Sequence, residues 1–361
     1  MSVFPHIMLL KQHHVVKVAP AKLDVKGVFA GRTMKFPMLK AEVPPAAPPL
    51  GGLPFRPTPA NLPFVRYAWG TLAFNVAVVL WGAYVRASGS GAGCGNHWPL
   101  CNGQVTPHSP KIGTIIEFTH RATSGPIDVA MVALLLLWAF RAFPKRHPVR
   151  LGATLSMIFL LTEALIGAGL VLLGHVEKNA SITRAYSLSA HLINTLTLLA
   201  CLTLTAWWAH GNPRLKIRGR SGWWAGASLG AVVLLGVTGA IAALGDTLFP
   251  AQSLAAGMAQ DWDPAANIFL RLRGLHPLFA AGVGTWLAFY AVSTASLLPR
   301  AKSLAWRLGV CLAAQMTAGV LNLLLLAPIW MQIVHLLLAD LLWISLVLLA
   351  AETLKISEEA A

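Results

Sequence analysis

The stretch MQIVHLLLADLLWISLVLL, residues 331–349, decides the fold class of this chain. Fifteen of its 19 residues are apolar, and a helix needs about 20 such residues to cross the hydrocarbon core of a bilayer. The apolar residues do not alternate with polar ones, which favours a helix over a strand of a membrane barrel. A single histidine, His335, lies inside the segment.

Seven further segments are at least as long and similarly apolar, which predicts an all-α integral membrane protein with eight transmembrane helices. These segments are residues 67–85, 112–140, 151–174, 185–209, 223–244, 268–292 and 304–326. The composition agrees, because 56% of the residues are hydrophobic and 11% are charged, whereas a soluble domain carries roughly 25% charged residues. A mean hydropathy of +0.64 excludes a soluble globular protein.

Basic residues outnumber acidic ones by 28 to 13, and their positions predict the orientation. The connections that share a side with the two termini carry 21 Lys and Arg residues, and the opposite side carries seven. Because basic loops stay in the cytoplasm, the N- and C-termini are predicted to be cytoplasmic. The net charge of +15 is therefore mostly an orientation signal. Membrane lipid, and no nucleic acid, is the predicted partner.

Residues 1–63 are predicted to form a disordered, Pro-rich and basic cytoplasmic tail. A mitochondrial transit peptide is one alternative, because such peptides are also basic and poor in acids. A later start at Met34 or Met38 is another. The predicted location is the plasma membrane of a bacterium, ahead of the mitochondrial inner membrane.

The rest of the chain divides into two predicted halves of four spans each, residues 64–210 and 211–361. Similar features recur in both halves in the same order. The recurring pairs are Gly82-Ala83 with Gly239-Ala240, His120 with His276, Ala168-Gly169 with Ala318-Gly319, and His191 with His335. Because each half has an even number of spans, we predict two tandem, pseudo-symmetric four-helix bundles related by an axis along the membrane normal.

Four histidines lie inside spans, one on each even-numbered span and at similar depths. An ionisable side chain in a membrane is costly and is a functional candidate by default. Neutral imidazole binds haem iron, and bundles hold cofactors on facing helices. We therefore predict one haem site in each half, with His120 and His191 as iron ligands in the first and His276 and His335 in the second. Interhelical hydrogen bonding is the alternative for a single histidine, and copper also stays open.

The two halves differ beside the first histidine of each pair. Glu117 lies three residues before His120, on the same helical face, and the equivalent residue in the second half is Arg273. A carboxylate suits proton transfer, which predicts a reactive site in the first half and a structural or electron-relay site in the second. Arg121 and Arg273 are predicted to pair with haem propionates, with snorkelling to the interface as the alternative for both.

The first loop outside the cytoplasm contains Cys94 and Cys101, seven residues apart. This side is oxidising, so a disulfide between them is allowed, and it could be structural or redox-active. Cys201 and Cys311 lie inside spans and are expected to be packing residues. The acidic residues inside the remaining spans are expected to form interhelical hydrogen bonds. They are Asp128, Glu163 and Asp340.

The first loop and the second span together closely resemble haem A synthase, and with the later histidines the resemblance covers about residues 64–352. The residues that carry it are Ser88-Gly-Ser-Gly-Ala-Gly-Cys94, Trp98-Pro-Leu-Cys101-Asn-Gly and Glu117-Phe-Thr-His120-Arg121. The resemblance implies oxidation of the C8 methyl of haem O, through an alcohol and a hydrated aldehyde, to the formyl group of haem A. Haem O synthase (protoheme farnesyltransferase) is then the implied partner.

The resemblance also implies roles for single residues. Glu117, His120 and His191 would form the substrate haem site, and His276 and His335 would hold a haem b cofactor. The cysteine pair is typical of the bacterial branch. Some members carry a second cysteine pair in the third outer loop, but residues 245–267 contain no cysteine here, which argues against a mechanism that needs that pair.

Two other functions fit the same histidines. A di-haem b-type electron carrier that oxidises quinol would use all four, although it gives no reason for the difference between Glu117 and Arg273. A haem or lipid transporter would keep the symmetry of the bundles without needing tightly held haem. The sequence does not identify the electron donor, and it leaves the formation of homo-oligomers open.

Overall fold

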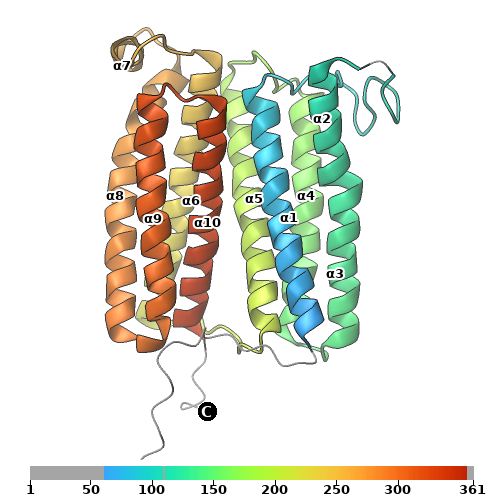
Figure 1. Ribbon diagram of the computed structural model, residues 1–361, viewed down its shortest axis with the longest axis vertical. Coiled ribbons are helices and arrows are strands. Elements are labelled where there is room, and N and C mark those ends of the chain that lie inside the picture. The colour runs from blue at the N-terminus through green and yellow to red at the C-terminus, as the bar shows by residue number, and fades with distance from the viewer. Residues whose placement is uncertain (1–60, 109, 356–361) are drawn as a thin grey trace, which may run out of the picture. The chain divides into compact units, whose positions relative to one another are not determined.

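The computed structural model describes residues 61–108 and 110–355, whose helices lie in one compact unit (Figure 1). The predicted tail, residues 1–63, falls almost wholly outside the described residues. Within the described part, the regular structure consists of helices and two isolated bridges. The helices are α1 (Leu62–Ala87), α2 (Ile112–Ala122), η2 (Thr123–Ile127), α3 (Asp128–Ala142), α4 (Pro148–Leu172), α5 (Ile182–Ala209), α6 (Gly219–Leu248), α7 (Leu254–Trp262), α8 (Ile268–Leu297), η3 (Pro299–Ala301), α9 (Lys302–Leu324) and α10 (Ile329–Leu354).

The eight predicted spans are confirmed, since eight helices in the described residues are long and apolar enough to cross a bilayer. The second span is continuous from Ile112 to Ala142 through α2, η2 and α3. Most helices run past the apolar segment that predicted them. For example, α10 continues to Leu354, and there Lys355 pairs with the buried carboxylate of Glu352 at 2.5 Å. The chain is therefore an all-α, multi-pass membrane protein.

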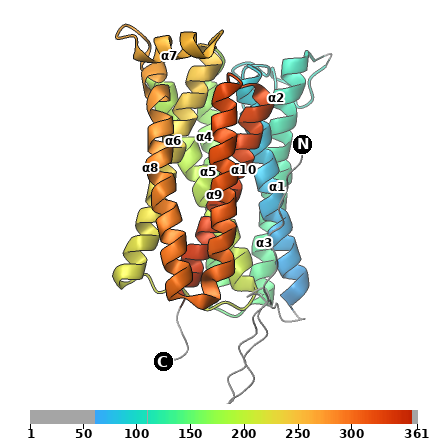
Figure 2. The same cartoon turned by 60° about the vertical axis from the view of Figure 1, so that its left-hand side comes forward.

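The helices pack as two groups that meet along α5 and α10 (Figures 1 and 2). The first group contains α1 to α5, and the second contains α6 and α8 to α10, with α7 packed on α8. Of the eight spans, α5 and α10 are the most buried. Nε1 of Trp343 in α10 donates a hydrogen bond of 2.8 Å to the carbonyl of Leu196 in α5. This grouping agrees with a duplicated four-helix unit, while residues 64–210 and 211–361 stay predicted as domains.

Arg86, near the end of α1, crosses from the first group to the second. Its Nη1 donates to the carbonyl oxygen of Ala243 at 2.8 Å and to Oγ1 of Thr247 at 2.7 Å, both in α6. Its Nη2 donates to Oε1 of Gln332 in α10 at 3.0 Å. Hydrogen bonds from a charged donor are roughly twice as strong as neutral ones. These three bonds therefore hold the two groups together at this end of the bundle.

Two local features of the fold cannot be predicted from the hydropathy of the sequence. The turn after His120 is a π-helix, η2, which contains Pro126. Because proline has no N–H and clashes with the preceding turn of a regular helix, a wider turn here lets the span continue. The other feature is the nine-residue helix α7 between α6 and α8, where Oγ of Ser253 accepts the N–H of Ala256 at 3.1 Å.

The first and last described helices, α1 and α10, have their outer chain ends at the same end of the bundle (Figure 1). The backbone N–H of Lys216, between α5 and α6, donates to the carbonyl of Leu354 at 2.7 Å there. At the opposite end, several guanidinium groups are hydrogen-bonded inside the protein. They belong to Arg86, Arg121, Arg184 and Arg273. The placement of the termini in the cytoplasm stays a prediction.

Candidate functional site

Each of the four membrane histidines lies against a glycine of a neighbouring helix. A Cβ atom added at Gly82 in α1 would lie 2.9 Å from Cε1 and 3.1 Å from Nε2 of His120 in α2. In the second group, a Cβ at Gly239 in α6 would lie 3.1 Å from Cε1 of His276 in α8. Carbon atoms in favourable contact are about 3.5–4.0 Å apart. A side chain at either glycine would therefore compete with the imidazole for its place.

The second histidine of each pair has the same arrangement. A Cβ at Gly319 in α9 would lie 3.1 Å from Cε1 of His335, and a Cβ at Gly167 in α4 would lie 4.0 Å from Cε1 of His191. The sequence comparison aligned Gly169 with Gly319. Among the described residues, however, no atom of a neighbouring helix lies within 4 Å of a Cβ at Gly169. The glycine that faces His191 is therefore Gly167, which directly precedes the matched dipeptide Ala168-Gly169.

The structure brings the histidines together as the predicted pairs. His120 and His191 lie in α2 and α5 of the first group of helices, and His276 and His335 lie in α8 and α10 of the second. All four rings are half-buried. In the described part of the chain, Nδ1 of His120, of His191 and of His335 is buried without a hydrogen-bond partner, and no three His, Cys, Asp or Glu side chains gather as a metal cluster. Two imidazoles in an apolar bundle, with space left by glycine and ring nitrogens not used by the protein, fit the axial ligands of a haem iron.

The polar side chains that approach the rings differ between the two groups. The contacts are Oε1 of Glu163 with Nδ1 of His191 at 3.2 Å, Oγ1 of Thr238 with Nδ1 of His276 at 2.9 Å, and Nε2 of Gln315 with Nε2 of His335 at 3.3 Å. Each neighbour comes from a different helix than the ring it approaches. Sequence analysis could not find these contacts, because they depend on how neighbouring helices are rotated and staggered.

Glu117 joins α2 to the loop between α1 and α2. Its Oε2 accepts the backbone N–H of Cys94 at 2.7 Å, and its Oε1 accepts from Nε and Nη2 of Arg121 at 3.1 and 2.5 Å. Nη1 of Arg121 also donates to the carbonyls of His97 and Leu100, at 2.5 and 2.9 Å. Only 3% of Glu117 is exposed. The carboxylate and the guanidinium therefore position the loop, while catalysis by Glu117 and propionate binding by Arg121 stay predictions.

The same loop contains the predicted disulfide, which joins Cys94 to Cys101. Both cysteines are buried. Oγ1 of Thr114 donates to the carbonyl of Gly93 at 2.7 Å. Any Cβ at Gly93 would collide with the backbone of Gly113, in the first turn of α2. The disulfide and this close approach of two backbones seat the loop on the start of α2.

Arg273 meets two carboxylates that sequence analysis did not identify. Its Nη1 lies 3.1 Å from Oδ1 of Asp246 in α6, and its Nη2 lies 2.6 Å from Oδ1 of Asp261 in α7. The Arg273 side chain is only 11% exposed. Asp261 is brought to Arg273 because α7 packs on α8, and this contact has no signature in the sequence. The pairing of Arg273 with a haem propionate stays a prediction.

Most of the other polar residues inside spans are found as expected. Asp128 accepts a hydrogen bond from an asparagine of α1, and Glu163 in α4 accepts from two side chains of α5. Oδ2 of Asp340 is buried and has no partner among the described residues. The two free cysteines, Cys201 and Cys311, are buried and half-buried.

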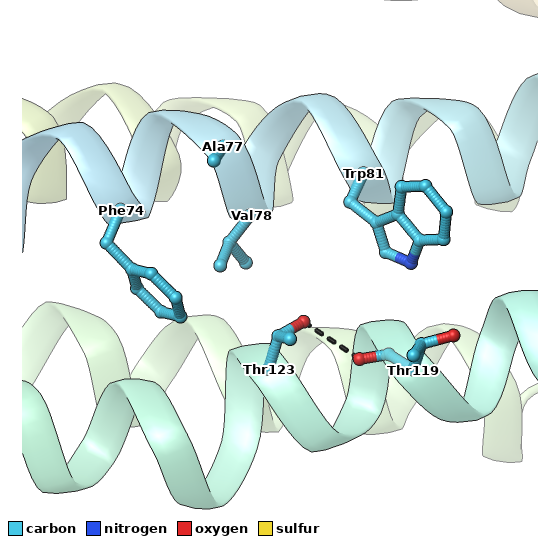
Figure 3. Close-up of a pocket in the computed structure, with 6 residues that line it drawn as sticks. All are labelled: Phe74, Ala77, Val78, Trp81, Thr119 and Thr123. Atoms are coloured by element: carbon cyan, nitrogen blue, oxygen red, sulfur yellow. Dashed lines mark hydrogen bonds between the residues drawn. The ribbon is translucent and has the colours of Figure 1, made fainter.

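An apolar pocket of about 140 Å³ opens between α1 and α2 (Figure 3). It is lined by Phe74, Ala77, Val78, Trp81, Thr119 and Thr123. Trp81 and Thr119 directly precede Gly82 and His120 in the sequence, so the pocket lies at the same level of α1 and α2 as the first imidazole, which is not one of its lining residues. Oγ1 of Thr123 donates to the carbonyl of Thr119 at 2.9 Å (Figure 3), which satisfies this hydroxyl within its own helix.

The fold and the site together define a class: a multi-pass helical membrane protein of two related four-helix groups, each with a pair of intramembrane imidazoles. Residues 65–347 match the model of the COX15-CtaA family, which is described as cytochrome oxidase assembly protein. The chain belongs to this family. The resemblance seen in the loop and in the second span is thereby confirmed.

Individual relatives come from bacteria. A protein of Thermus thermophilus named protoheme IX farnesyltransferase is 49% identical over 302 residues, which are 82% of this chain and 50% of that protein. The heme A synthase of Halalkalibacterium halodurans is 39% identical over 127 residues, 35% of this chain and 42% of that protein. Heme A synthase of Exiguobacterium sibiricum is 37% identical over 122 residues, 34% of this chain and 39% of that protein.

The aligned parts span half or less of the length of these curated relatives. Together with the eight apolar helices, the bacterial relatives place this chain among the multi-pass proteins of the bacterial cell membrane.

Proposed function

We propose that this protein is a haem A synthase, an oxidoreductase that converts the C8 methyl group of haem O to the formyl group of haem A. The observation that carries the proposal is the repeated pair of intramembrane imidazoles, each seated against a glycine, with Glu117 on the ligand helix of the first pair and Arg273 at the equivalent place in the second. Membership of the family and the relatives named heme A synthase support it.

In the first half, His120 and His191 would bind the iron of the substrate haem. Gly82 and Gly167 leave the two rings their space, and Nδ1 of His120 has no competing partner in the described part of the protein. The apolar pocket between α1 and α2 lies at the level of His120 along these helices. Its lining suits an apolar substituent such as the farnesyl chain of haem O, which would reach the site from the lipid side.

In the second half, His276 and His335 would hold a haem b cofactor. When bound, haem b supplies one-electron redox chemistry. Thr238 lies 2.9 Å from Nδ1 of His276, so it orients this ring and leaves Nε2 for a metal. A hydrogen bond to the second nitrogen commonly fixes the orientation of a ligating imidazole.

Glu117 would take up and release protons in the first half. Turning a methyl group into a formyl group removes two hydrogens from carbon, adds one oxygen atom and transfers four electrons to an external acceptor, and protons must move at the site as these transfers occur. The Glu117 carboxylate lies one helical turn from His120 and contacts the backbone of the loop through Cys94. It therefore stands between the imidazole and the loop, where a proton acceptor is needed.

Haem O synthase is the proposed partner. The Thermus thermophilus relative is named protoheme IX farnesyltransferase, and the part aligned with this chain makes up only half of its length. Farnesylation of protohaem produces haem O, the substrate proposed here. If that relative carries both activities in one chain, its name and its extra length are both explained. Such a fusion would support close cooperation between the two enzymes.

The test is to express this protein in a host that makes haem O but no haem A, and to identify the extracted pigments by chromatography and mass spectrometry. Haem A or its C8 alcohol is expected only when the protein is present, and a His191→Ala variant is the matched control. Haem B alone, with haem O untouched, would support the di-haem electron carrier instead. Purified protein free of haem despite an adequate haem supply would support a transporter.

A further inference from the structure

Glu163 is a membrane carboxylate that the proposed reaction does not use, and it is aimed at a proposed ligand. Its Oε1 lies 3.2 Å from Nδ1 of His191, and the two side chains come from different helices, α4 and α5. The Glu163 side chain is 19% exposed. A carboxylate at this depth is costly unless it is paired or hydrogen-bonded. The imidazole lies within ion-pairing distance, and Nδ1 of His191 has no hydrogen-bond partner among the described residues.

The carboxylate is held in place from both sides. Its Oε2 accepts from Nδ2 of Asn194 at 2.6 Å, and its Oε1 also accepts from Oγ1 of Thr195. Asn194 is fixed in turn, because Nδ2 donates to the carbonyl of Phe159 at 2.8 Å and Oδ1 accepts from Oγ1 of Thr162 at 2.6 Å. The orientation of the carboxylate is thus set by a network, and its approach to the ring is a built contact.

The second half has an amide where the first has this carboxylate. Glu163 lies four residues before Gly167, the glycine that faces His191, and Gln315 lies four residues before Gly319, the glycine that faces His335. The amide of Gln315 approaches its ring as well, with Nε2 of Gln315 3.3 Å from Nε2 of His335. The two positions therefore correspond in sequence spacing, with a carboxylate near Nδ1 of His191 in the first half and an amide near Nε2 of His335 in the second.

We propose that, once haem is bound, Glu163 accepts the Nδ1–H of His191 and that this contact makes the first haem site more electron-donating than the second. The inference deepens the proposed function, because it takes His191 and His335 as iron ligands. A carboxylate that accepts a proton from one nitrogen of an imidazole fixes the tautomer and raises the basicity of the other nitrogen. Such a ligand, with a negative charge nearby, stabilises ferric over ferrous iron. Glu163 is a positioning residue in this proposal, since it acts through His191.

The test exchanges the two side chains in the full-length, haem-loaded protein. The variants are Glu163→Gln and Gln315→Glu, with Glu163→Asp to restore the carboxylate. The readouts are the midpoint potential of each haem, from optical redox titration, and the low-spin ferric signals in electron paramagnetic resonance. Titration of a His191→Ala variant identifies which signal belongs to the first half.

Glu163→Gln is expected to move the potential of the first haem to more positive values and to leave the second unchanged. Glu163→Asp should return it toward the original value. Gln315→Glu is expected to lower the potential of the second haem, and it tests the proposal even where Glu163→Gln loses haem. A merely structural role would change haem content without moving a potential.

Unchanged potentials in both exchange variants, with haem retained, would overturn the proposal while leaving haem A synthesis intact. Retention of both haems in His191→Ala would overturn the ligand assignment and this proposal with it. Failure of the pigment experiment, with the potentials shifted as expected, would instead reject only the oxidation of haem O.

Discussion

A glycine-to-alanine series at the four histidines gives the sharpest prediction about the sites. The Cβ that Gly82→Ala introduces would start 2.9 Å from Cε1 of His120, so the ring must retreat by about 0.6–1.1 Å to reach a normal contact. Overpacking of this kind typically costs about 1–3 kcal/mol. At about 1.4 kcal/mol for each factor of ten, haem affinity in the first half should fall about 5- to 150-fold.

The series should be graded by distance. Gly239→Ala and Gly319→Ala, with contacts of 3.1 Å, should weaken haem binding in the second half, whereas Gly167→Ala, at 4.0 Å, should have a small effect. Gly169→Ala is the matched control, because no neighbouring-helix atom of the described residues lies within 4 Å of its Cβ. Alanine is the better helix former by about 1 kcal/mol, so the loss of haem should come without any loss of helix stability.

The assay is haem content per purified protein, with the two halves distinguished by their spectra, together with thermal melting of the haem-free protein. Gly82→Ala should lose first-half haem and Gly169→Ala should keep it, and the melting temperature shows how much of the overpacking cost falls on the haem-free fold. Equal haem retention by Gly82→Ala and Gly169→Ala would refute the idea that glycine makes room for a ligating imidazole. So would equal losses at all five positions, since they would point to a general effect on packing.

Three further predictions follow from the other contacts. Glu117→Ala should keep haem bound but stall the oxidation at the alcohol, which mass spectrometry of the pigments would reveal; normal haem A output would remove Glu117 from the mechanism. Arg273→Ala should expose α7 to protease, because it removes charged hydrogen bonds worth about 1.5–3 kcal/mol each before relaxation, and unchanged cleavage within α7 would contradict this. Reduction of Cys94–Cys101 should speed hydrogen exchange in the loop and not in α10; uniform protection would show that the disulfide does not hold the loop.

Much of the fold could be predicted because a bilayer permits few solutions. A segment such as residues 331–349 has no alternative to a helix once it is placed in lipid, and the cost of an imidazole there singles out His335. The disulfide could be predicted because its cysteines are close in sequence and lie on an oxidising side. These inferences depend on composition and local spacing, which the sequence displays directly.

The remaining details depend on how neighbouring helices are staggered, and local spacing does not determine that. The dipeptide match selected Gly169, although Gly167 is the glycine that faces His191. The partners of Arg273 come from the end of α6 and from α7, a helix too short to show in the hydropathy. The sequence identifies Glu163 as a membrane acid, but its closeness to His191 depends on how α4 packs on α5 and cannot be predicted from spacing.

The hydrogen bonds made by Arg86 depend on a difference between the two halves of the chain. Arg86 donates to the carbonyl of Ala243, 157 residues later, which is also the spacing between Gly82 and Gly239. With the predicted duplication, Arg86 and Ala243 hold corresponding positions in the two halves. In a homodimer of half-length chains, symmetry would bring two arginines together there, and facing like charges cost several kcal/mol. Because this chain carries an arginine at one position and an alanine at the other, a single guanidinium can join the two groups of helices without that repulsion.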